Sequence, residues 1–485
     1  MNGSKATART FTAEARRTRR SAEGVDVGRE RQRSPCRSTS VPAFLRVLRA
    51  SAVKTVSFVV AVVALSTMAF ADDARPVAIR GGRVLPIAGA PIDDGVVVIQ
   101  DGKISAVGGK DTPVPEGAEV VDAKGRIVMP GLVDGLSTLG LVEVDQVDAT
   151  KDSDEAVAPL TPQVVAADGI NVGSPVFRIT RMNGTTTAVV APDAGNVVAG
   201  RSSAIHLDGA RLDAMLVAPV VAMHAAIGEP PMMRYGKKDQ APSTRMGEVA
   251  MLRAAIVKAR EYAAKWARFE DLKAHPKPPE PGKEAEAPEP PSVDLELDAW
   301  GAVLRREIPL VVRAQRLSDI QAAMRVAKEF DLRLVVQGGA EAWKVAADLA
   351  AAQVPVLVGP VTTDPDSMET LGARPDNAAL LAAAGVKVAI VSAENHNARN
   401  LPYEAGIAVA NGLPMDAALA AITLVPAQVL GLDARVGALV PGKDADVILL
   451  DGDVIQPRTK VLRMWIRGRE VQLTSRQTEL ADKWR

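Results

Sequence analysis

Short apolar runs alternate with helical patterns through the middle of this 485-residue chain. The runs lie at residues 186–193, 309–315, 333–339, 355–361 and 386–394. A strand formed by such a run is buried on both faces, because its apolar residues are consecutive rather than alternating. Strands of this kind, separated by amphipathic segments such as 317–331 and 341–353, are typical of a parallel sheet covered by helices. The middle of the chain is therefore predicted to have an α/β fold.

The two ends of this α/β region are rich in short β patterns and turn dipeptides, as in residues 77–109. Two β-rich ends around a long middle predict a composite β-sandwich built from residues 76–130 and 434–474. The strand–helix units between them, at 131–433, then predict a (β/α)8 TIM-like barrel. A Pro- and charge-rich stretch at about 273–292 predicts an exposed insertion in this barrel.

The first 71 residues differ in charge from the rest, with 13 Lys and Arg against 4 Asp and Glu. Lys54 precedes an apolar run at 56–68, which ends on the sequence Ala-Phe-Ala. This layout predicts a signal peptide at 53–71, cleaved after Ala71, and a periplasmic or secreted protein. An uncleaved anchor is the alternative, but the run is shorter than the roughly 20 residues of a membrane span.

Residues 1–52 are rich in Arg and Ser and show no apolar periodicity. They are either a disordered extension or the result of a start site assigned too early, in which case Val53 is the true start. The single cysteine, Cys36, lies in this segment, which excludes disulfides and thiol nucleophiles from the exported part. The formal net charge of zero argues against a nucleic-acid partner.

Three stretches of sequence resemble the amidohydrolase superfamily, in its imidazolonepropionase-like branch. They are GVVVIQDGKISAVG at 95–108, IVMPGLVDGLSTLG at 127–140, and the segment 418–453 with its Gly-Lys-Asp-Ala-Asp run. The resemblance covers about residues 76–474. It implies a distorted (β/α)8 barrel with a composite β-sandwich. It also implies hydrolysis of amide-type C–N bonds, not peptide bonds, at a centre of one or two divalent metal ions, usually zinc.

The positions that carry the family's metal ligands hold other residues here. The two histidines of its HxH motif fall on Leu136 and Thr138, while the preceding Asp134 is kept. The other ligand positions fall on Arg313, Gln315, Gln337, Ala393 and, in place of a lysine, His224. The whole chain has 4 histidines, too few for a binuclear centre of the family type. We therefore predict no metal ligands and no cofactor.

Arg313 is the most informative of these replacements. A guanidinium is always charged and cannot bind a metal, so at a histidine position it repels a cation and attracts an anion. Two interpretations stay open: an ion pair with a carboxylate such as Asp134, or the binding of an anionic ligand. Gln315, Gln337 and His224 are expected to bind the ligand beside it.

The segment 392–406 places an imidazole, carboxylates, carboxamides and a guanidinium in a loop after a barrel strand. His396 could act as a general base, with Glu394 to orient it, and Asp134 completes the predicted catalytic set. Asn397 and Arg399 are expected to bind the ligand. The alternative is a structural helix start, capped by an Asn and followed by a Pro in the first turn.

Two further loops are predicted to overhang the same end of the barrel. The acidic stretch 143–155 could hold a hard cation such as calcium, or could be a solvated acidic face. The glycine-rich stretch 193–209 predicts a hairpin flap, with Arg201 and His206 as polar candidates to contact a ligand.

Three classes of function remain open from the sequence. The chain could be an enzyme with a rewired site, or a catalytically inactive protein that binds a small molecule through Arg313. It could also be a structural subunit that pairs with itself or with a complete amidohydrolase homologue. None of the three requires a stable membrane span after signal cleavage.

The charge pattern of the first 71 residues leads to a direct prediction. We expect the mature protein to begin at Asp72, because the small-x-small sequence at 69–71 is typical of signal cleavage. Mass spectrometry of the N-terminal peptide of the exported protein tests this. A mature terminus far from Asp72 would contradict the signal-peptide interpretation.

Overall fold

The structure, a computed structural model, describes residues 75–276, 287–362, 365 and 367–485. The described residues all belong to one compact unit, Ala71–Arg485. The predicted extension at 1–52 and the predicted signal peptide at 53–71 lie outside the described residues. Among the helices that are described, none is long and apolar enough to cross a membrane.

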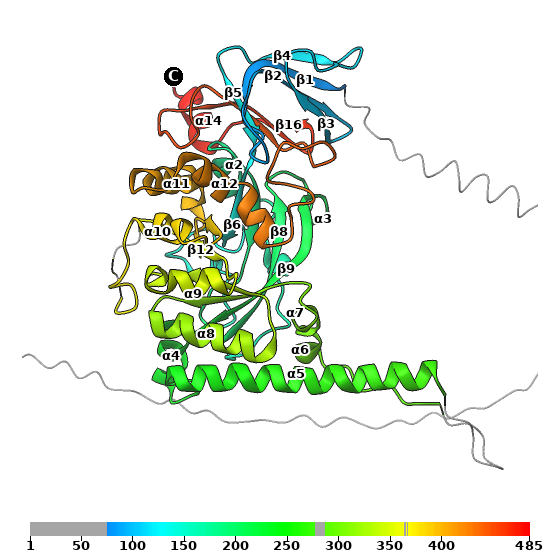
Figure 1. Ribbon diagram of the computed structural model, residues 1–485, viewed down its shortest axis with the longest axis vertical. Helices are drawn as coiled ribbons and strands as arrows, with labels where there is room; N and C mark the ends of the chain where they lie inside the picture. Colours follow the sequence, from blue (N-terminus) through cyan, green and yellow to red (C-terminus); the bar gives the residue numbers. More distant parts are fainter. Residues whose placement is uncertain (1–74, 277–286, 363–364, 366) are drawn as a thin grey trace, which may run out of the picture. The chain divides into compact units, whose positions relative to one another are not determined.

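Strands from both ends of the chain form one eight-stranded sheet (Figure 1). β5 (Ile127–Pro130) pairs antiparallel with β14 (Val447–Leu450) and so joins the two ends. The order is β16-β15-β14-β5-β1-β2-β3, and β4 also pairs with β1. The other strands are β1 (Val77–Val84), β2 (Ile92–Gln100), β3 (Lys103–Gly108), β4 (Glu119–Asp122), β15 (Val461–Ile466) and β16 (Arg469–Glu470). This composite sheet has its own buried core, which includes Ile79, Val97 and Trp465.

A second eight-stranded sheet forms a nearly closed barrel and confirms the predicted mixed α/β fold. Its order is β13-β12-β11-β10-β9-β8-β7-β6. Its strands are β6 (Leu132–Ser137), β7 (Thr185–Val190), β8 (Val198–His206), β9 (Leu216–Ala226), β10 (Leu310–Ala314), β11 (Leu334–Gly338), β12 (Val356–Val358) and β13 (Val388–Ile390). The ends of the sheet meet where the Ala393 amide donates to the Leu136 carbonyl at 2.9 Å and the Thr138 amide donates to the Glu394 carbonyl at 3.1 Å.

One barrel strand runs against the others, so the barrel is not a regular (β/α)8 repeat. β8 pairs antiparallel with both β7 and β9, while the other neighbouring strands pair in parallel. The stretch 193–209 therefore contributes to an antiparallel hairpin, as predicted, but β8 belongs to the barrel wall and is not a flap. Gly200 (φ +128°) on β8 lies against a neighbouring loop, because a side chain there would begin 2.9 Å from the Val164 carbonyl oxygen. Glycine is typical of loops, whereas Gly200 here allows a loop to pack closely against a strand.

The helices lie mainly against the outer face of the parallel strands (Figure 1). The helix predicted at 317–331 is confirmed as α8 (Leu317–Phe330). The pattern at 341–353 forms a 3-10 turn, Ala342–Val345, followed by α9 (Ala346–Ala351). The others are α2 (Pro175–Arg181), α3 (Leu212–Met215), α4 (Glu229–Tyr235), α5 (Arg245–Ala274), α6 (Leu295–Asp298), α7 (Gly301–Leu304), α10 (Asn377–Ala383), α11 (Leu401–Ala410), α12 (Met415–Ala421), α13 (Leu424–Val429) and α14 (Arg476–Lys483).

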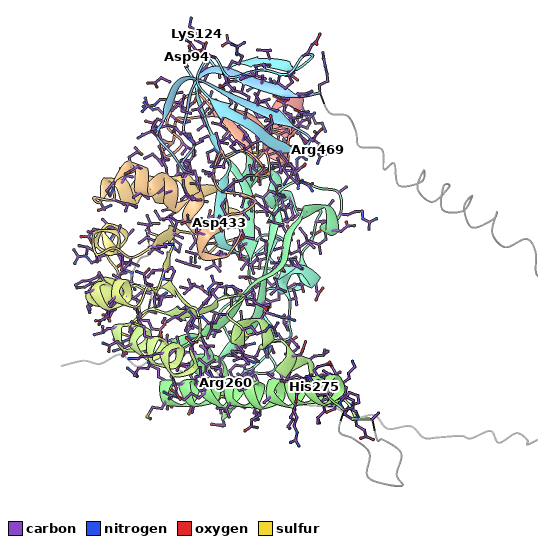
Figure 2. All side chains as sticks on the ribbon, turned by 45° about the vertical axis from the view of Figure 1, so that its right-hand side comes forward. Asp94, Lys124, Arg260, His275, Asp433 and Arg469 are labelled. Atoms are coloured by element: carbon purple, nitrogen blue, oxygen red, sulfur yellow. The ribbon has the colours of Figure 1, made fainter. Side chains whose placement is uncertain are left out.

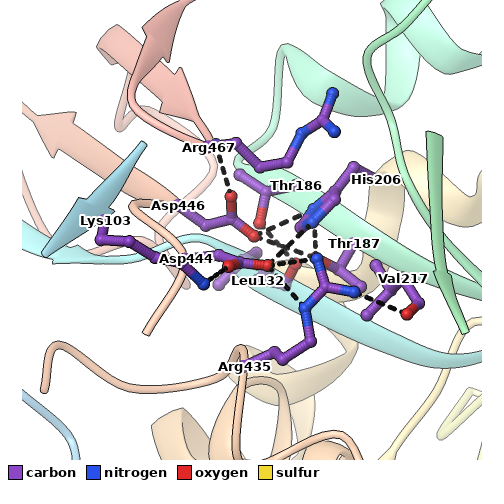
Figure 3. Close-up of polar contacts among 10 residues, drawn as sticks. All are labelled: Lys103, Leu132, Thr186, Thr187, His206, Val217, Arg435, Asp444, Asp446 and Arg467. Atoms are coloured by element: carbon purple, nitrogen blue, oxygen red, sulfur yellow. Dashed lines mark hydrogen bonds and ion pairs between the residues drawn. The ribbon is translucent and has the colours of Figure 1, made fainter. Parts of the chain in front are cut away.

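A buried ionic network joins the composite sheet to the barrel (Figure 3). His206, at the end of β8, has one ring nitrogen 3.3 Å from Asp444 and the other 3.2 Å from Asp446. Lys103, at the start of β3, pairs with Asp444, and Arg435 contacts the same carboxylate through two nitrogens. Since β8 runs in reverse, His206 lies at the end of the barrel away from the carboxyl ends of the parallel strands. This position excludes His206 from the predicted ligand site.

The two carboxylates hold His206 in its charged form. Burial alone would lower the pKa of the imidazole, but the charge of Asp446 and the hydrogen bonds to both aspartates raise it to about 9. Burial would likewise raise the pKa of Asp444, but its partners His206, Lys103 and Arg435 hold it well below its ordinary value of 3.8. At neutral pH both ring nitrogens therefore donate hydrogen bonds.

This network predicts how stability depends on pH. Since folding raises the pKa of His206 from 6.5 to about 9, its stabilising contribution is complete below pH 6.5 and is lost as pH rises through 9. The shift corresponds to at most about 3 kcal/mol. We expect urea denaturation to show a fall in the free energy of unfolding between pH 6.5 and 9.5, and His206→Gln to remove most of this fall.

The matched control is His275→Gln. His275 lies exposed at the carboxyl end of α5 (Figure 2), where it contacts Asp271. This variant should keep the pH dependence of the native chain. An unchanged pH dependence in His206→Gln would contradict the role given to the buried imidazolium.

Candidate functional site

The carboxyl ends of the parallel barrel strands meet at one end of the barrel, which we call the mouth. Groups that follow these strands carry the chemistry in barrel enzymes. Here β6, β7 and β9 to β13 all point toward the mouth. The predicted residues on or directly after these strands are Asp134, His224, Arg313, Gln315, Gln337, Glu394, His396, Asn397 and Arg399.

The strand register directs three of the predicted polar residues into the barrel. Val311 and Val335 belong to the core inside the barrel, and Arg313 and Gln337 follow them by two residues, so they face the same way. Arg313 and Gln337 are also register partners on β10 and β11. His224 on β9 is the partner of Val311. An imidazole, a guanidinium and a carboxamide therefore face the interior from three neighbouring strands.

His224 is buried without a regular hydrogen bond. Its exposed fraction is 3%, and neither ring nitrogen has a partner of standard hydrogen-bond geometry. Burial lowers the pKa of this imidazole to about 4, and a weaker interaction with Gln337 opposes the shift. The ring is therefore neutral at pH 7 and offers one donor and one acceptor to the barrel interior.

Arg313 forms an ion pair, as the sequence predicts, but its partner is Glu369 at 3.0 Å and not Asp134. Glu369 follows β12 and is almost fully buried. The same carboxylate accepts from the Arg245 guanidinium at 2.8 Å and from the Glu229 amide. The buried carboxylate of Glu369 therefore binds two arginines and one backbone amide near the mouth.

Asp134 is unavailable to Arg313 because other groups surround it. Its carboxylate accepts from the Ser392 amide at 3.1 Å, from the Ser392 hydroxyl and from the Leu136 amide at 3.3 Å. Burial raises the pKa of Asp134 to about 7, and these hydrogen bonds oppose the shift. The side chain is 0% exposed and links β6 to the residues after β13. It holds the barrel closed, and no part of it is open to a ligand.

The predicted catalytic loop after β13 forms a 3-10 turn, His396–Asn400, before α11. The side chain of His396 is 46% exposed; its Nδ1 lies 2.9 Å from the Asn395 side-chain oxygen and 3.7 Å from Asp145. Burial, followed by the charge of Asp145, raises the pKa of Glu394. The predicted Asn cap of this helix is wrong, because neither the turn nor α11 has a side-chain cap. The predicted Pro in the first turn of α11 is confirmed.

Other predicted residues make local contacts. Arg201 is the register partner of Met223, which belongs to the core outside the barrel, so Arg201 also faces outward. Its guanidinium donates to the Gln163 carbonyl. The Gln315 side chain accepts from the Ala340 amide at 3.0 Å. Arg399 contributes its backbone carbonyl, which accepts from Asn183 at 2.7 Å.

The residues at the mouth do not fit a zinc centre of the family type. Leu136 packs in the core inside the barrel, and Thr138 contributes its amide to barrel closure. Across the described ranges, no group of three or more His, Cys, Asp and Glu side chains is arranged to hold a metal ion. In the acidic loop, Glu143 accepts from Asn171 and Ser174, and Asp154 pairs with Arg234.

Sequence reasoning missed Glu369, Arg245 and Ser392. Glu369 lies 56 residues from Arg313, in a segment with no periodic pattern. Arg245 is the first residue of α5, where an arginine has no special meaning in the sequence. Ser392 lies where the predicted strand 386–394 meets the predicted loop 392–406, which is the one signal that could have drawn attention to it.

Comparison with known proteins agrees with this geometry. The family model described as "Amidohydrolase family" matches residues 360–471. The crystal structure of an amidohydrolase from Thermotoga maritima MSB8 is 32% identical, with a TM-score of 0.74 over 82% of this chain and 99% of that chain. The fold thus defines an α/β-barrel protein with a composite sheet. More specifically, the chain belongs to the amidohydrolase superfamily.

Two curated proteins are also similar. Amidohydrolase tasK of Hapsidospora irregularis is 27% identical over 393 residues, which are 77% of this chain and 39% of that protein. A 5-methylthioadenosine/S-adenosylhomocysteine deaminase of Symbiobacterium thermophilum is 47% identical over 58 residues, 11% of this chain and 13% of that enzyme. The chain therefore spans well under half the length of the curated relatives that it matches.

The ion pair of Arg313 and Glu369 leads to a test of site architecture. We expect Arg313→Met to lower the free energy of unfolding by about 2 kcal/mol. This is less than the about 3–5 kcal/mol typical of a stranded buried charge, because Arg245 still pairs with Glu369. Glu369→Gln in the same chain should restore part of the loss, whereas Asp134→Asn should not.

Denaturation curves of the single and double variants give the coupling energy of each pair. Coupling between Arg313 and Asp134, with none between Arg313 and Glu369, would contradict the observed partner.

Proposed function

We propose that this chain is an exported member of the superfamily that binds a small amide or cyclic amide at the barrel mouth, without a resident binuclear metal centre. The observation that carries the proposal is His224, which is buried, neutral and without a regular hydrogen bond beside Gln337 and Arg313. A buried polar group without a partner costs about 1–3 kcal/mol. A ligand that pairs with both ring nitrogens recovers this cost.

The polar groups inside the barrel match the chemistry of an amide. A neutral imidazole and a carboxamide each provide a donor and an acceptor, and an amide or cyclic amide presents a carbonyl acceptor and an N–H donor. The charge of Arg313 is shared with Glu369 but remains 20% exposed. It therefore also favours an anionic substituent, such as the carboxylate of an N-acyl amino acid.

A second candidate function is hydrolysis of the bound C–N bond by the loop after β13. The observation in its favour is the contact between His396 and Asp145, which orients a half-exposed imidazole. An imidazole held in this way can act as a general base toward water, with Glu394 beside it. The names of the related amidohydrolases support this reading, because they describe hydrolysis in the relatives.

The proposal includes no cofactor. Arg313 and Gln337 stand where the family has metal ligands by resemblance, and neither side chain offers zinc the imidazole or carboxylate that it binds in proteins. Export to the periplasm or medium, a small-molecule ligand and pairing with another copy or with an amidohydrolase homologue remain parts of the proposal.

The test is a binding and turnover assay with N-acetyl amino acids and cyclic amides such as hydantoin. We expect binding to persist after treatment with a strong chelator. Gln337→Leu should weaken binding about tenfold, which corresponds to the loss of one buried hydrogen bond. Gln100→Leu, at an exposed position of β2, is the matched control and should bind normally.

Turnover in the same assay decides between the two functions. Product formation that disappears in His396→Ala, with the fold intact, would establish the hydrolase. Binding that is lost on chelation, together with stoichiometric zinc in the purified protein, would contradict the metal-independent site.

A further inference from the structure

A large groove lies at the end of the barrel opposite the mouth. Its volume is about 1150 Å³, and its lining includes residues that begin strands β10 to β13 or directly precede them, such as Pro309, Pro355 and Lys387. One wall is α8 and the other is α9 with the residues after it. Pockets for small organic ligands usually measure about 300–1,000 Å³. The groove therefore has room for such a ligand, at a place that the proposed function does not use.

The lining of the groove carries an excess of positive charge. Its charged side chains are Arg306, Arg325, Lys328, Arg333 and Lys387 against Asp331 and Asp348. Arg306 pairs with Asp331, and Arg333 donates to the backbone carbonyls of Arg306 and Glu307. Within the part of the chain that the structure describes, no ion pair engages Arg325, Lys328 or Lys387, all of them exposed. These three cations are therefore available to a ligand.

The floor of the groove is apolar. Its residues are buried against the barrel and the helices: Leu334, Val335, Leu349, Val354, Val386 and Val429. Arg325 and Lys328 are three residues apart on α8, so they share one helix face above this floor. Lys387 adds a third cation just before β13. An apolar floor below three unpaired cations suits a molecule that is apolar at one end and anionic at the other.

We propose that this groove binds a small amphipathic anion, with an apolar body on the floor and a carboxylate, sulfonate or phosphate group at Arg325, Lys328 and Lys387. Charge complementarity selects this occupant. The cations also stand out on a body that is otherwise acidic, because residues after 71 hold 54 Asp and Glu against 45 Lys and Arg.

The test compares two fluorescent probes on the full exported protein. They are 8-anilinonaphthalene-1-sulfonate, an amphipathic anion, and N-phenyl-1-naphthylamine, its uncharged counterpart. We expect the triple variant Arg325→Gln, Lys328→Gln, Lys387→Gln to bind the sulfonate about tenfold more weakly, as the loss of three screened charge contacts predicts. Binding of the uncharged probe should change less than about twofold.

The matched control removes three exposed cations of α5 by the substitutions Lys258→Gln, Lys265→Gln and Arg268→Gln. It has the same net charge as the groove variant and should bind both probes normally. Equal weakening in the two triple variants would show unspecific attraction and overturn the proposal. A protein that is dimeric by light scattering, and binds the sulfonate only after dilution to the monomer, would assign the groove to a second copy and also overturn it.

Discussion

A charged imidazole between two aspartates connects the two sheets of this protein. His206 ends a barrel strand, Asp444 and Asp446 directly precede a strand of the composite sheet, and Lys103 and Arg435 complete the charge balance. Each buried charge is tolerable only because the others are present, since removal of one leaves an uncompensated charge in a low-dielectric interior. The junction between the two sheets depends on this network.

Strand register determines which polar side chains point into the barrel. Alternation on β10 and β11 places valines deep in the barrel, with Arg313 and Gln337 two residues further along. On β9, His224 lies level with one of those valines. A shift of one residue in any of these strands would turn the polar group to the helices, where no ligand could reach it. The candidate site is thus a consequence of barrel geometry rather than of a local motif.

The two ends of the barrel have different electrostatics. At the mouth, Glu369 binds Arg313 and Arg245, and Asp319 also pairs with Arg245, so the positive charge of the two arginines is already balanced. At the opposite end, cations of α8 and Lys387 line a groove without acidic partners among the residues described. The mouth suits an amide that can carry an anionic substituent near Arg313, whereas the groove suits an anion with an apolar body. This contrast is why the two proposals concern different ligands and can fail independently.

The sequence by itself determined the α/β alternation and the union of both ends, because periodicity and turn residues act over short distances. The superfamily came from the resemblance of three stretches of sequence to its members. The strand matching that the resemblance implies also predicts that Leu136 and Thr138 stand at the positions of the usual ligands. Only the tertiary structure decided that Arg313 pairs with Glu369, 56 residues away in the sequence. The same holds for the hydrogen bond between Asp134 and Ser392, which are 258 residues apart. Only the structure shows that β8 runs antiparallel to its neighbours, which places His206 at the end of the barrel opposite the mouth. Contacts of this kind depend on which strands become neighbours and in what register, and a local pattern of residues does not specify the partner of an individual side chain.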